Sequence, residues 1–239
     1  MSNGIDISSY QKGLKIKPNN GYEFVILRGG YTGWGTGITH YKDKCFDDFY
    51  TQCKKNNIPV GVYWYSCANT YNKGVSEGLY LYNNCLKGKQ FEYPIYIDVE
   101  DSHHQIKSKR GTTDAIIGFC ETLEKMGFYV GIYANQDWFI NKIDTVRLEK
   151  YDKWVAKWSS NKPNLFFNYG LWQNSDSGNI SGYRIDTDIS FLDYPNIIIN
   201  KKLNGYSDKK SLEEIAKEVI NGQWGNGKDR KIKLTHARL

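Results

Sequence analysis

Long apolar runs are missing from the sequence, because none approaches the roughly 18 residues that a transmembrane helix requires. The 239-residue chain has only four histidines, scattered except for the adjacent His103 and His104, and their spacing indicates no metal site. Neither an arginine-rich run nor a nucleic-acid-binding module accompanies the net charge of +6. We therefore expect no cofactor, no metal, no nucleic-acid partner and no insertion into a membrane.

Cysteine is too irregularly spaced to predict a disulfide framework. The five cysteines are odd in number and show no Cys-x-x-Cys spacing. The N-terminal residues, from Met1 to Asp6, lack the basic and apolar regions of a signal peptide. We expect a protein made in the cytoplasm without a signal peptide, with reduced and buried thiols.

Two carboxylates end a short apolar run at residues 95–101. In a strand, Asp98 and Glu100 project from one face and the isoleucines from the other. Two like charges this close cannot both ionise freely, so the pKa of one should be raised. Such a site holds a proton-donating acid beside an ionised carboxylate, the pair that glycoside hydrolysis requires. A solvated acidic turn is the alternative for this segment taken alone.

Strand-like and helix-like segments alternate along the first two hundred residues. Helical spacing is found at residues 43–56, 75–86 and 113–126. Strand-patterned runs occur at residues 4–8, 24–28, 60–65, 95–100, 129–133, 153–157, 170–173 and 185–189. This α/β alternation predicts an irregular TIM-like (β/α) barrel. The short connections between the later strands predict an incomplete ring of helices.

Catalytic side chains of such barrels lie at the C-terminal ends of strands. The carboxylates near predicted strand ends are Asp6, Asp98, Glu100 and Asp186. The further candidates for substrate binding are Arg28, Tyr63, Tyr65, Tyr133, Trp158, Trp172 and Gln173. Tyr and Trp combine flat apolar faces with a polar tip, which suits sugar stacking, although barrel packing is the alternative for each of them. Arg28 is expected to pair with the acidic cluster or to form an exposed ion pair.

The composition changes after Asn200. We expect a barrel over residues 1–200, a linker over 201–207 and a short helical C-terminal segment over 208–239. Ser211 and Glu214 have the spacing of a capping box. The residues that follow Ser211 carry one apolar helix stripe, which Asn221 and Gly222 end. A segment this short cannot bury an ample core of its own.

Eight segments occur in the order seen in glycoside hydrolase family 25: GIDISSYQKG, FVILRGG, GVYWYS, YPIYIDVED, GFYVGIYAN, WVAKW, LWQNSDSG and IDTDISF. Over about residues 3–195 the chain therefore resembles the Chalaropsis-type lysozymes of this family, which include many phage endolysins. The resemblance implies an irregular β/α barrel that hydrolyses the β-1,4 bond between N-acetylmuramic acid and N-acetylglucosamine in bacterial peptidoglycan. Such a bacteriolytic enzyme acts on the cell wall after release, for which we expect a holin.

The family's site residues are carried over by motif. The aspartate of its D-x-S motif falls on Asp6, the D-x-E pair on Asp98 and Glu100, and its late aspartate on Asp186. Where many members have Asn two positions after the last of these, this chain has Asp188, whose extra charge would raise neighbouring pKa values. We predict that Glu100 is the general acid. Asp98 would stay ionised, and Asp6 and Asp186 would complete the acidic floor.

The stereochemistry of hydrolysis is left open by the spacing of Asp98 and Glu100. Residues two apart on a strand have Cα atoms ~6.6 Å apart. Side-chain direction then allows either the ~5–5.5 Å carboxyl separation of direct retention or the ~6.5–9.5 Å separation of inversion. We favour a third route, retention in which Asp98 orients the substrate's own 2-acetamido group as the nucleophile.

The C-terminal segment resembles the wall-binding repeat of some pneumococcal phage lysozymes through the run LEEIAKEVINGQWGNGKDR. The repeat in that family continues into a further helix, whereas this chain stops at Leu239. We therefore expect a partial repeat that is partly ordered at best, or that self-association with another copy completes.

Two other functions compete with this interpretation. A non-catalytic peptidoglycan-binding barrel would lack the acid, but Glu100 is present. An amidase or peptidase acting on the stem peptide requires a zinc or Cys/His centre. Cys67 lies near a strand end, but no histidine lies nearby in the chain to activate it.

Overall fold

The computed structural model describes residues 1–207, 212–228 and 230–231. It divides into two compact units, Met1–Gly205 and Tyr206–Leu239, which are treated separately below.

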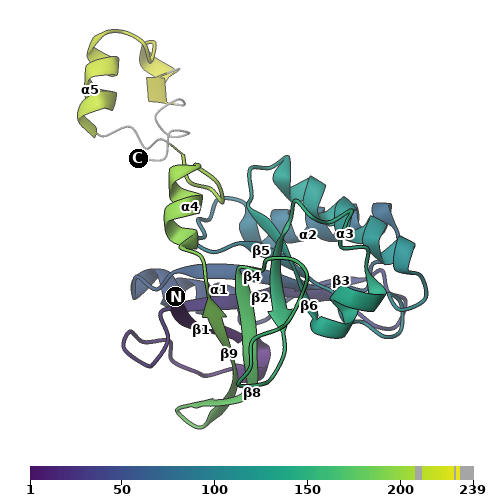
Figure 1. The fold of residues 1–239 in the computed structure, drawn as a ribbon. Coiled ribbons are helices and arrows are strands. Elements are labelled where there is room, and N and C mark those ends of the chain that lie inside the picture. The colour runs from purple at the N-terminus through teal and green to yellow at the C-terminus, as the bar shows by residue number, and fades with distance from the viewer. Residues whose placement is uncertain (208–211, 229, 232–239) are drawn as a thin grey trace. The chain divides into compact units, whose positions relative to one another are not determined.

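The first unit is built on a closed barrel of eight strands (Figure 1). The barrel strands are β1 (Ser2–Ile7), β2 (Phe24–Thr32), β4 (Val60–Tyr65), β5 (Ile95–Asp98), β6 (Val130–Asn135), β7 (Asp152–Ala156), β8 (Leu171–Ile180) and β9 (Tyr183–Ser190). Neighbours from β1 through β8 pair in parallel, whereas β9 runs antiparallel between β8 and β1 and so closes the ring. The predicted α/β barrel is confirmed, and each of the eight predicted strand runs falls on one barrel strand.

Two features of the sheet were not predicted. A ninth strand, β3 (His40–Lys42), pairs antiparallel with the end of β2 outside the ring. The β8–β9 hairpin is longer than its apolar core and turns at Ser181 and Gly182, whose φ angles are 53° and 86°. Two successive positive φ values give the tight turn that matches the twist of a hairpin. This hairpin is drawn in green at the bottom of Figure 1.

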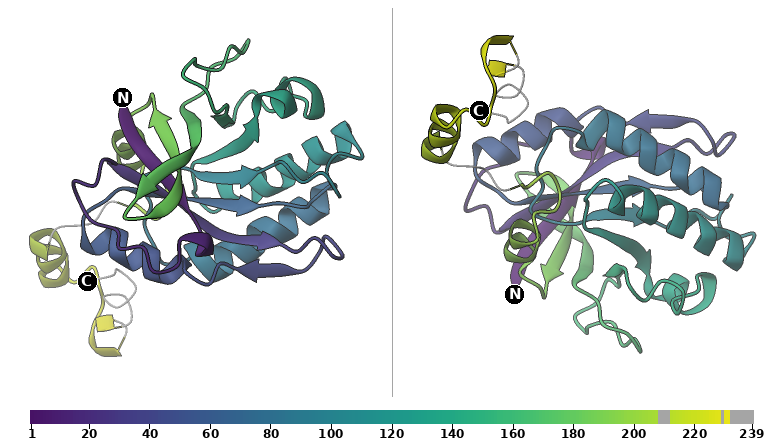
Figure 2. Two further views of the ribbon diagram at one scale, coloured as in Figure 1. Left: turned by 90° about the horizontal axis from the view of Figure 1, so that it is seen from below. Right: turned by 90° about the horizontal axis from the view of Figure 1, so that it is seen from above.

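Helices cover only part of the barrel. They are α1 (Phe46–Lys55), α2 (Tyr71–Leu81), α3 (Lys109–Glu124) and α4 (Tyr194–Asn200), with single turns at Ser9–Gln11, Tyr82–Leu86 and Trp138–Lys142. Within the described residues 157–170, no helix connects β7 to β8, so the predicted incomplete ring is confirmed. Helices α2 and α3 pack side by side along one side of the sheet in all views (Figures 1 and 2).

Helices α2 and α3 each begin four residues before their predicted start. The side chain of Thr70 accepts a hydrogen bond from the backbone of Lys73, and that of Ser108 accepts one from Gly111. These caps satisfy backbone N–H groups of the first turn, which have no partner within the helix. The apolar stripe alone places the start about one turn inside the helix, so the polar first turn is missed.

The barrel unit extends into the segment that we expected to be a linker. Asn204 is fully buried, and its side chain accepts a hydrogen bond from the backbone N of Tyr129 and donates one to the backbone oxygen of Tyr93. The first five residues of the expected linker therefore belong to the first unit.

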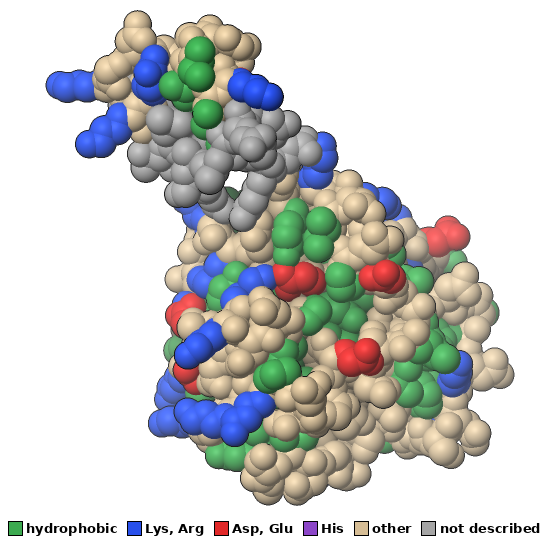
Figure 3. Space-filling model, turned by 90° about the vertical axis from the view of Figure 1, so that its left-hand side faces the viewer, with side chains coloured by type: hydrophobic (Ala, Val, Ile, Leu, Met, Phe, Trp, Pro, Cys, Tyr) green, Lys and Arg blue, Asp and Glu red, His purple; other side chains and the backbone are tan. Residues whose placement is uncertain are grey.

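The core lies between the outer face of the sheet and the helices, and all five cysteines are buried in this unit as free thiols. On the face drawn in Figure 3, acidic side chains stand among hydrophobic ones, whereas most Lys and Arg side chains gather toward one edge of the barrel unit. Among the described helices, none combines the length and apolarity needed to cross a bilayer.

The second unit contains helix α5 (Leu212–Ile220), which ends in a turn at Gly222 with φ of 74°. The indole N–H of Trp224 donates to the Glu218 carboxylate over 2.9 Å, and Arg230 Nε donates to the backbone oxygen of Gly225. The short helical C-terminal segment is therefore present. Ser211 and the side chain of Glu214, the predicted capping box, lie outside the described residues.

Candidate active site

A groove of about 580 Å³ opens at the carboxyl ends of the parallel strands, and the four predicted acids line it together. Asp6 lies on β1, Asp98 ends β5 with Glu100 two residues beyond, and Asp186 lies on β9. The register explains this convergence: Asp6 is directly opposite Asp186 in the β1–β9 pair, and Asp98 is paired with Tyr65 on one side and Tyr133 on the other. Closure of the barrel thus gathers side chains that are up to 180 residues apart in the chain.

Asp6 and Asp98 form the buried floor of the groove. Burial raises the pKa of Asp6 well above its usual value, and the charges of Asp186 and Glu100 raise it further. Burial likewise raises the pKa of Asp98, with further contributions from Glu100 and Asp6 and an opposing one from Arg28. Within the described structure, Asp98 Oδ1 has no hydrogen-bond partner. We expected Asp98 to stay ionised from its position in the sequence alone. Its burial in the structure favours the neutral form instead.

Glu100 and Asp186 are more accessible to a ligand. Glu100 has an exposed surface, yet the groove walls displace much of the surrounding water, so desolvation raises its pKa and the charges of Asp186 and Asp101 add to the effect. Burial and the charge of Asp176 raise the pKa of Asp186 to about 6, against the opposing charge of Arg184. Because the acids interact, their protons belong to the cluster rather than to one residue. The groove can therefore present a carboxylic acid and a carboxylate at neutral pH.

Asp188, where many relatives of the resembled family have Asn, lies fully buried behind this floor. Its Oδ1 accepts a hydrogen bond from the indole N–H of Trp154 over 2.8 Å. Burial and the charge of Asp6 raise the pKa of Asp188 well above its usual value. In its neutral form this carboxyl group has the size of an Asn side chain and, like it, carries no charge. Asp in place of Asn then adds no charge beneath the acids of the groove.

Gln173 connects the acids to two aromatic side chains. Its Nε2 donates to Asp6 Oδ2 over 2.8 Å, and its Oε1 accepts from Tyr133 Oη and from Trp158 Nε1, both at 3.0 Å. Gln173 and Tyr133 are buried, whereas Trp158 is 61% exposed. Trp158 lines a second hollow of about 450 Å³ that shares Asp186 with the groove. The Gln173 amide therefore holds Asp6 and Trp158 in fixed positions.

Arg28 lies in the groove, but its ion pair is with Asp43 rather than with the acidic cluster. The Arg28 Nε–Asp43 Oδ2 distance is 2.8 Å, and Nη2 donates to Ser9 Oγ over 2.9 Å. Both partners of the pair are largely buried, so the alternative of an exposed ion pair is wrong as well. Arg28 still acts on the cluster at longer range, because its charge lowers the pKa of Asp98.

The structure places three of the seven predicted sugar contacts, Arg28, Tyr63 and Tyr65, in the lining of the groove. Trp158 lines the adjoining hollow, and the buried Tyr133 and Gln173 reach the groove only through the Gln173–Asp6 hydrogen bond. Trp172 does not: it is buried, and its indole N–H donates to the backbone oxygen of Lys157 over 2.9 Å. Neighbouring residues of a strand face opposite sides of the sheet, so Trp172 points away from the side that Gln173 occupies.

Several groove residues were missed in the sequence. They are Tyr10, Tyr31, Trp34 and Lys44, which line the groove, and Asp43, which forms the ion pair with Arg28. Tyr10 lies in the Ser9–Gln11 turn just after β1, and Trp34 lies two residues beyond the end of β2. Their place after strand ends was therefore an available signal. Strand β2 continues for four residues beyond the predicted run 24–28 and ends at Thr32. The sequence pattern therefore did not show where this strand ends.

Comparison with known proteins finds similarities in both units of the chain. The sequence profile of glycosyl hydrolases family 25 matches residues 5–183, and that of the CW_7 repeat matches residues 213–237. The chain is 27% identical over 192 residues to an autolytic lysozyme of Clostridium acetobutylicum, covering 78% of this chain and 54% of that protein. It is 26% identical over 210 residues to a lysozyme of Streptococcus phage Cp-7, covering 83% and 56%. The chain thus spans about half the length of these curated relatives.

Solved structures agree in fold. The CTP1L endolysin superposes with a TM-score of 0.71 at 24% identity, covering 83% of this chain and 69% of that one. The lysozyme from Streptomyces coelicolor superposes with a TM-score of 0.68 at 20% identity, covering 86% and 98%. Since the family profile spans most of the chain and the four acids of the groove fall within or just beyond its limits, the chain belongs to glycosyl hydrolases family 25.

Proposed function

We propose that the protein is a peptidoglycan hydrolase, a lysozyme that cleaves the β-1,4 bond between N-acetylmuramic acid and N-acetylglucosamine. One observation carries the proposal: Asp6, Asp98, Glu100 and Asp186 line a single open groove in a family 25 barrel. Glycoside hydrolysis requires an acid that protonates the leaving oxygen and a second group that stabilises or attacks the sugar C1.

Glu100 is the general acid in this proposal. A general acid must reach the glycosidic oxygen, and of the D-x-E pair Glu100 is exposed to the groove whereas Asp98 is 4% exposed. Its raised pKa keeps the proton available toward neutral pH. The positive charge of Arg28 lowers the pKa of Asp98. Positive charge that develops on the sugar favours the ionised form of Asp98 further.

Asp98, Asp6 and Asp186 then serve the developing oxocarbenium ion. In substrate-assisted retention, Asp98 orients the 2-acetamido group and stabilises its positive charge as the acetamido oxygen attacks C1. Asp6 and Asp186 supply negative charge around the same sugar. Tyr63, Tyr65 and Trp158 provide hydroxyl, ring and indole contacts along the groove.

The test is the release of reducing sugar ends from purified peptidoglycan. Glu100→Gln should abolish the release, because an amide cannot transfer a proton to the glycosidic oxygen as an acid does, while the melting temperature stays within a few degrees of the wild type. Glu124→Gln is the matched control: its carboxylate forms a surface ion pair with Lys150 at 2.9 Å, and such pairs contribute little. Equal rates for the wild type and Glu100→Gln would remove Glu100 from this role.

The same assay separates the competing functions. Wall binding with no reducing ends from the wild type would favour the non-catalytic glycan-binding barrel. New free amino groups without reducing ends would favour an amidase or peptidase.

The second unit is proposed to bind the wall and to hold the hydrolase there, because residues 213–237 match the CW_7 repeat. We also propose that the protein is an endolysin that reaches the wall through a holin. Self-association with a second copy of the chain would complete the repeat. The net charge of +6 suits the anionic polymers of bacterial walls.

A further inference from the structure

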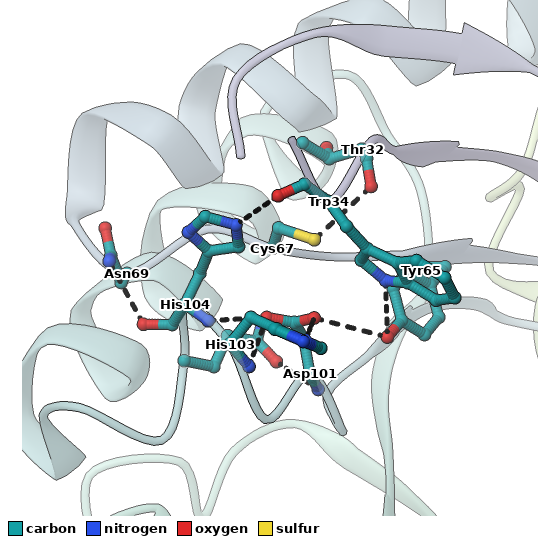
Figure 4. Close-up of polar contacts among 9 residues, drawn as sticks. Thr32, Trp34, Tyr65, Cys67, Asn69, Asp101, His103 and His104 are labelled. Atoms are coloured by element: carbon teal, nitrogen blue, oxygen red, sulfur yellow. Dashed lines mark hydrogen bonds and ion pairs between the residues drawn. The ribbon is translucent and has the colours of Figure 1, made fainter. Parts of the chain in front are cut away.

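Two loops at the carboxyl end of the barrel are joined beside the groove by a contact between His104 and Trp34, which we call the clasp (Figure 4). One is residues 33–39, between β2 and β3, and the other is residues 101–107, between Glu100 and α3. His104 Nε2 lies 2.7 Å from the backbone oxygen of Trp34. A carbonyl oxygen only accepts, so Nε2 is the protonated nitrogen of this ring and donates. The ring also lies against Gly37, where an added Cβ would meet it at 2.8 Å.

A buried carboxylate anchors the second loop. Asp101, 1% exposed, accepts hydrogen bonds at Oδ1 from the backbone N of His103 at 3.1 Å and of His104 at 2.6 Å. Its own backbone N donates to the side chain of Gln105. Because Asp101 directly follows Glu100, this anchor ties the loop that carries His104 to the strand end that carries the proposed acid.

The clasp orients one exposed aromatic side chain, Trp34. Its indole N–H donates to Tyr65 Oη at 3.1 Å, and that hydroxyl donates in turn to Asp101 Oδ2 at 3.4 Å. The ring of His103 stacks on the indole with 6.2 Å between centroids. Trp34 lines the groove together with Tyr65, yet it remains 61% exposed. Since its single polar group is already bonded, the apolar ring is what the indole offers to a ligand.

We propose that Trp34 is a specificity-determining platform that stacks on a sugar ring of the glycan strand, on the Tyr65 side of the acids. His104 and Asp101 are positioning residues that hold this platform. The assignment rests on the proposed hydrolase function and deepens it by assigning a further sugar-binding position. The indole is fixed by Tyr65 and His103, and the backbone that carries it is held by His104. Such a side chain loses little conformational freedom when a ligand binds, which is how a preorganised contact gains affinity. A sugar is the favoured occupant because Trp34 continues the acid-lined groove and its ring offers no charge for a peptide carboxylate.

The first experiment uses the full chain and a peptide-free glycan polymer of alternating N-acetylglucosamine and N-acetylmuramic acid. Trp34→Ala should raise KM by about tenfold, the effect of losing one well-packed aromatic contact, and leave kcat within about twofold. Ile38→Ala is the matched control, because Ile38 lies in the same loop and is 57% exposed but is absent from the described lining of the groove. It should leave both constants unchanged.

The second experiment tests the positioning role of His104. His104→Ala should raise KM as Trp34→Ala does, and His104→Gln, whose amide N–H can reach the same carbonyl oxygen, should restore most of the affinity. If His104 acts through Trp34, the double variant should match Trp34→Ala alone. Multiplying effects in the double variant, or no rescue by Gln, would show that His104 does not act through the indole.

The outcomes separate this inference from the function on which it rests. A wild type that releases no reducing ends from the polymer contradicts the hydrolase proposal itself. An active wild type with equal KM for Trp34→Ala and Ile38→Ala overturns the platform alone. A KM increase seen only on walls that keep their stem peptides would assign Trp34 to the peptide instead of the sugar, and so would also contradict the proposal.

Discussion

At the scale of single residues, the acids of the groove hold protons to higher pH than free carboxyl groups because each is desolvated and each repels the next. Asp186 raises the pKa of both Asp6 and Glu100 through its charge. Removing that charge therefore lowers the pKa of the proposed acid. The alkaline limb of the pH profile reports where the acid loses its proton.

Asp186→Asn should accordingly shift the alkaline limb of kcat/KM toward lower pH, in addition to any loss of rate. The measurement is a pH profile of reducing-end release for the wild type and the variant in a buffer of constant ionic strength. An alkaline limb that stays in place would show that Asp186 does not act on the proton of Glu100.

Glu77 is a buried acid that does not line the groove. Its carboxylate accepts hydrogen bonds from Thr32 and Ser66, both at 2.6 Å, and from the backbone N of Cys67. Burial outweighs these donors and raises the pKa of Glu77 from 4.5 to about 7. Between these two values the folded state binds more protons than the unfolded state, so this group makes stability fall as pH rises, with no further change above about pH 7.

Glu77→Gln should remove this dependence. The free energy of unfolding of the variant minus that of the wild type should rise by about 3 kcal/mol from pH 4.5 to 7, because only the wild type loses stability through Glu77 over this range. Urea unfolding at several pH values measures this difference, in which the shared contribution of the groove acids cancels. A difference that is constant with pH would mean that Glu77 titrates as it does in the unfolded chain.

At the scale of elements, helices α2 and α3 are in backbone contact through two glycines. A Cβ on Gly74 would lie 1.9 Å from the backbone oxygen of Ala115, and one on Gly118 would lie 2.2 Å from that of Tyr71. Backbone atoms cannot rotate away as a flexible side chain does, so any larger residue must push the helices apart.

Gly74→Ala or Gly118→Ala should therefore lower the free energy of unfolding by about 3 kcal/mol, although alanine favours a helix over glycine. Gly35→Ala is the control, because nothing lies within 4 Å of its added Cβ. Denaturant unfolding of the three variants measures the effect. Equal stability of Gly74→Ala and Gly35→Ala would contradict this close packing.

At the scale of the whole molecule, the division into two units makes the proposed roles separable. A cut after Gly205 preserves Asn204, whose hydrogen bonds belong to the barrel, whereas a cut after Asn200 removes it. We expect the chain of residues 1–205 to keep the melting temperature of the barrel and its kcat on soluble glycan.

The same shortened chain should bind intact Gram-positive walls more weakly than the full chain, and lyse them more slowly at low enzyme concentration. Co-sedimentation with a panel of walls, followed by turbidity assays, measures both effects. Equal binding by the two chains would contradict the wall-binding role of residues 206–239.

Much of this architecture was predicted from the sequence because its signals are local. Apolar or alternating runs of four to six residues identified all eight barrel strands. Strands covered by helices read as hydrophobic segments, as at residues 60–65, whereas others, as at residues 185–189, alternate between apolar and polar residues. Asp98 and Glu100 were found because they end such a run, and position at a strand end needs no knowledge of the partner strands. Asp6 and Asp186 lie within β1 and β9, and the family motifs were what singled them out. Because helical spacing is a local signal too, the core of each long helix was found, while its capped polar first turn was not.

Only the tertiary structure decided which side chains meet. The antiparallel β9 sets Asp186 opposite Asp6, the β8 register turns Gln173 inward and Trp172 outward, and Arg28 finds Asp43 instead of the acids. Trp34 and His104 are 70 residues apart, and nothing in either neighbourhood of the sequence indicates their contact. The sequence by itself determined the elements and the residue types at their ends. Pairing, face and proton affinity depend on distant neighbours and on burial, and these exist only once the barrel has closed.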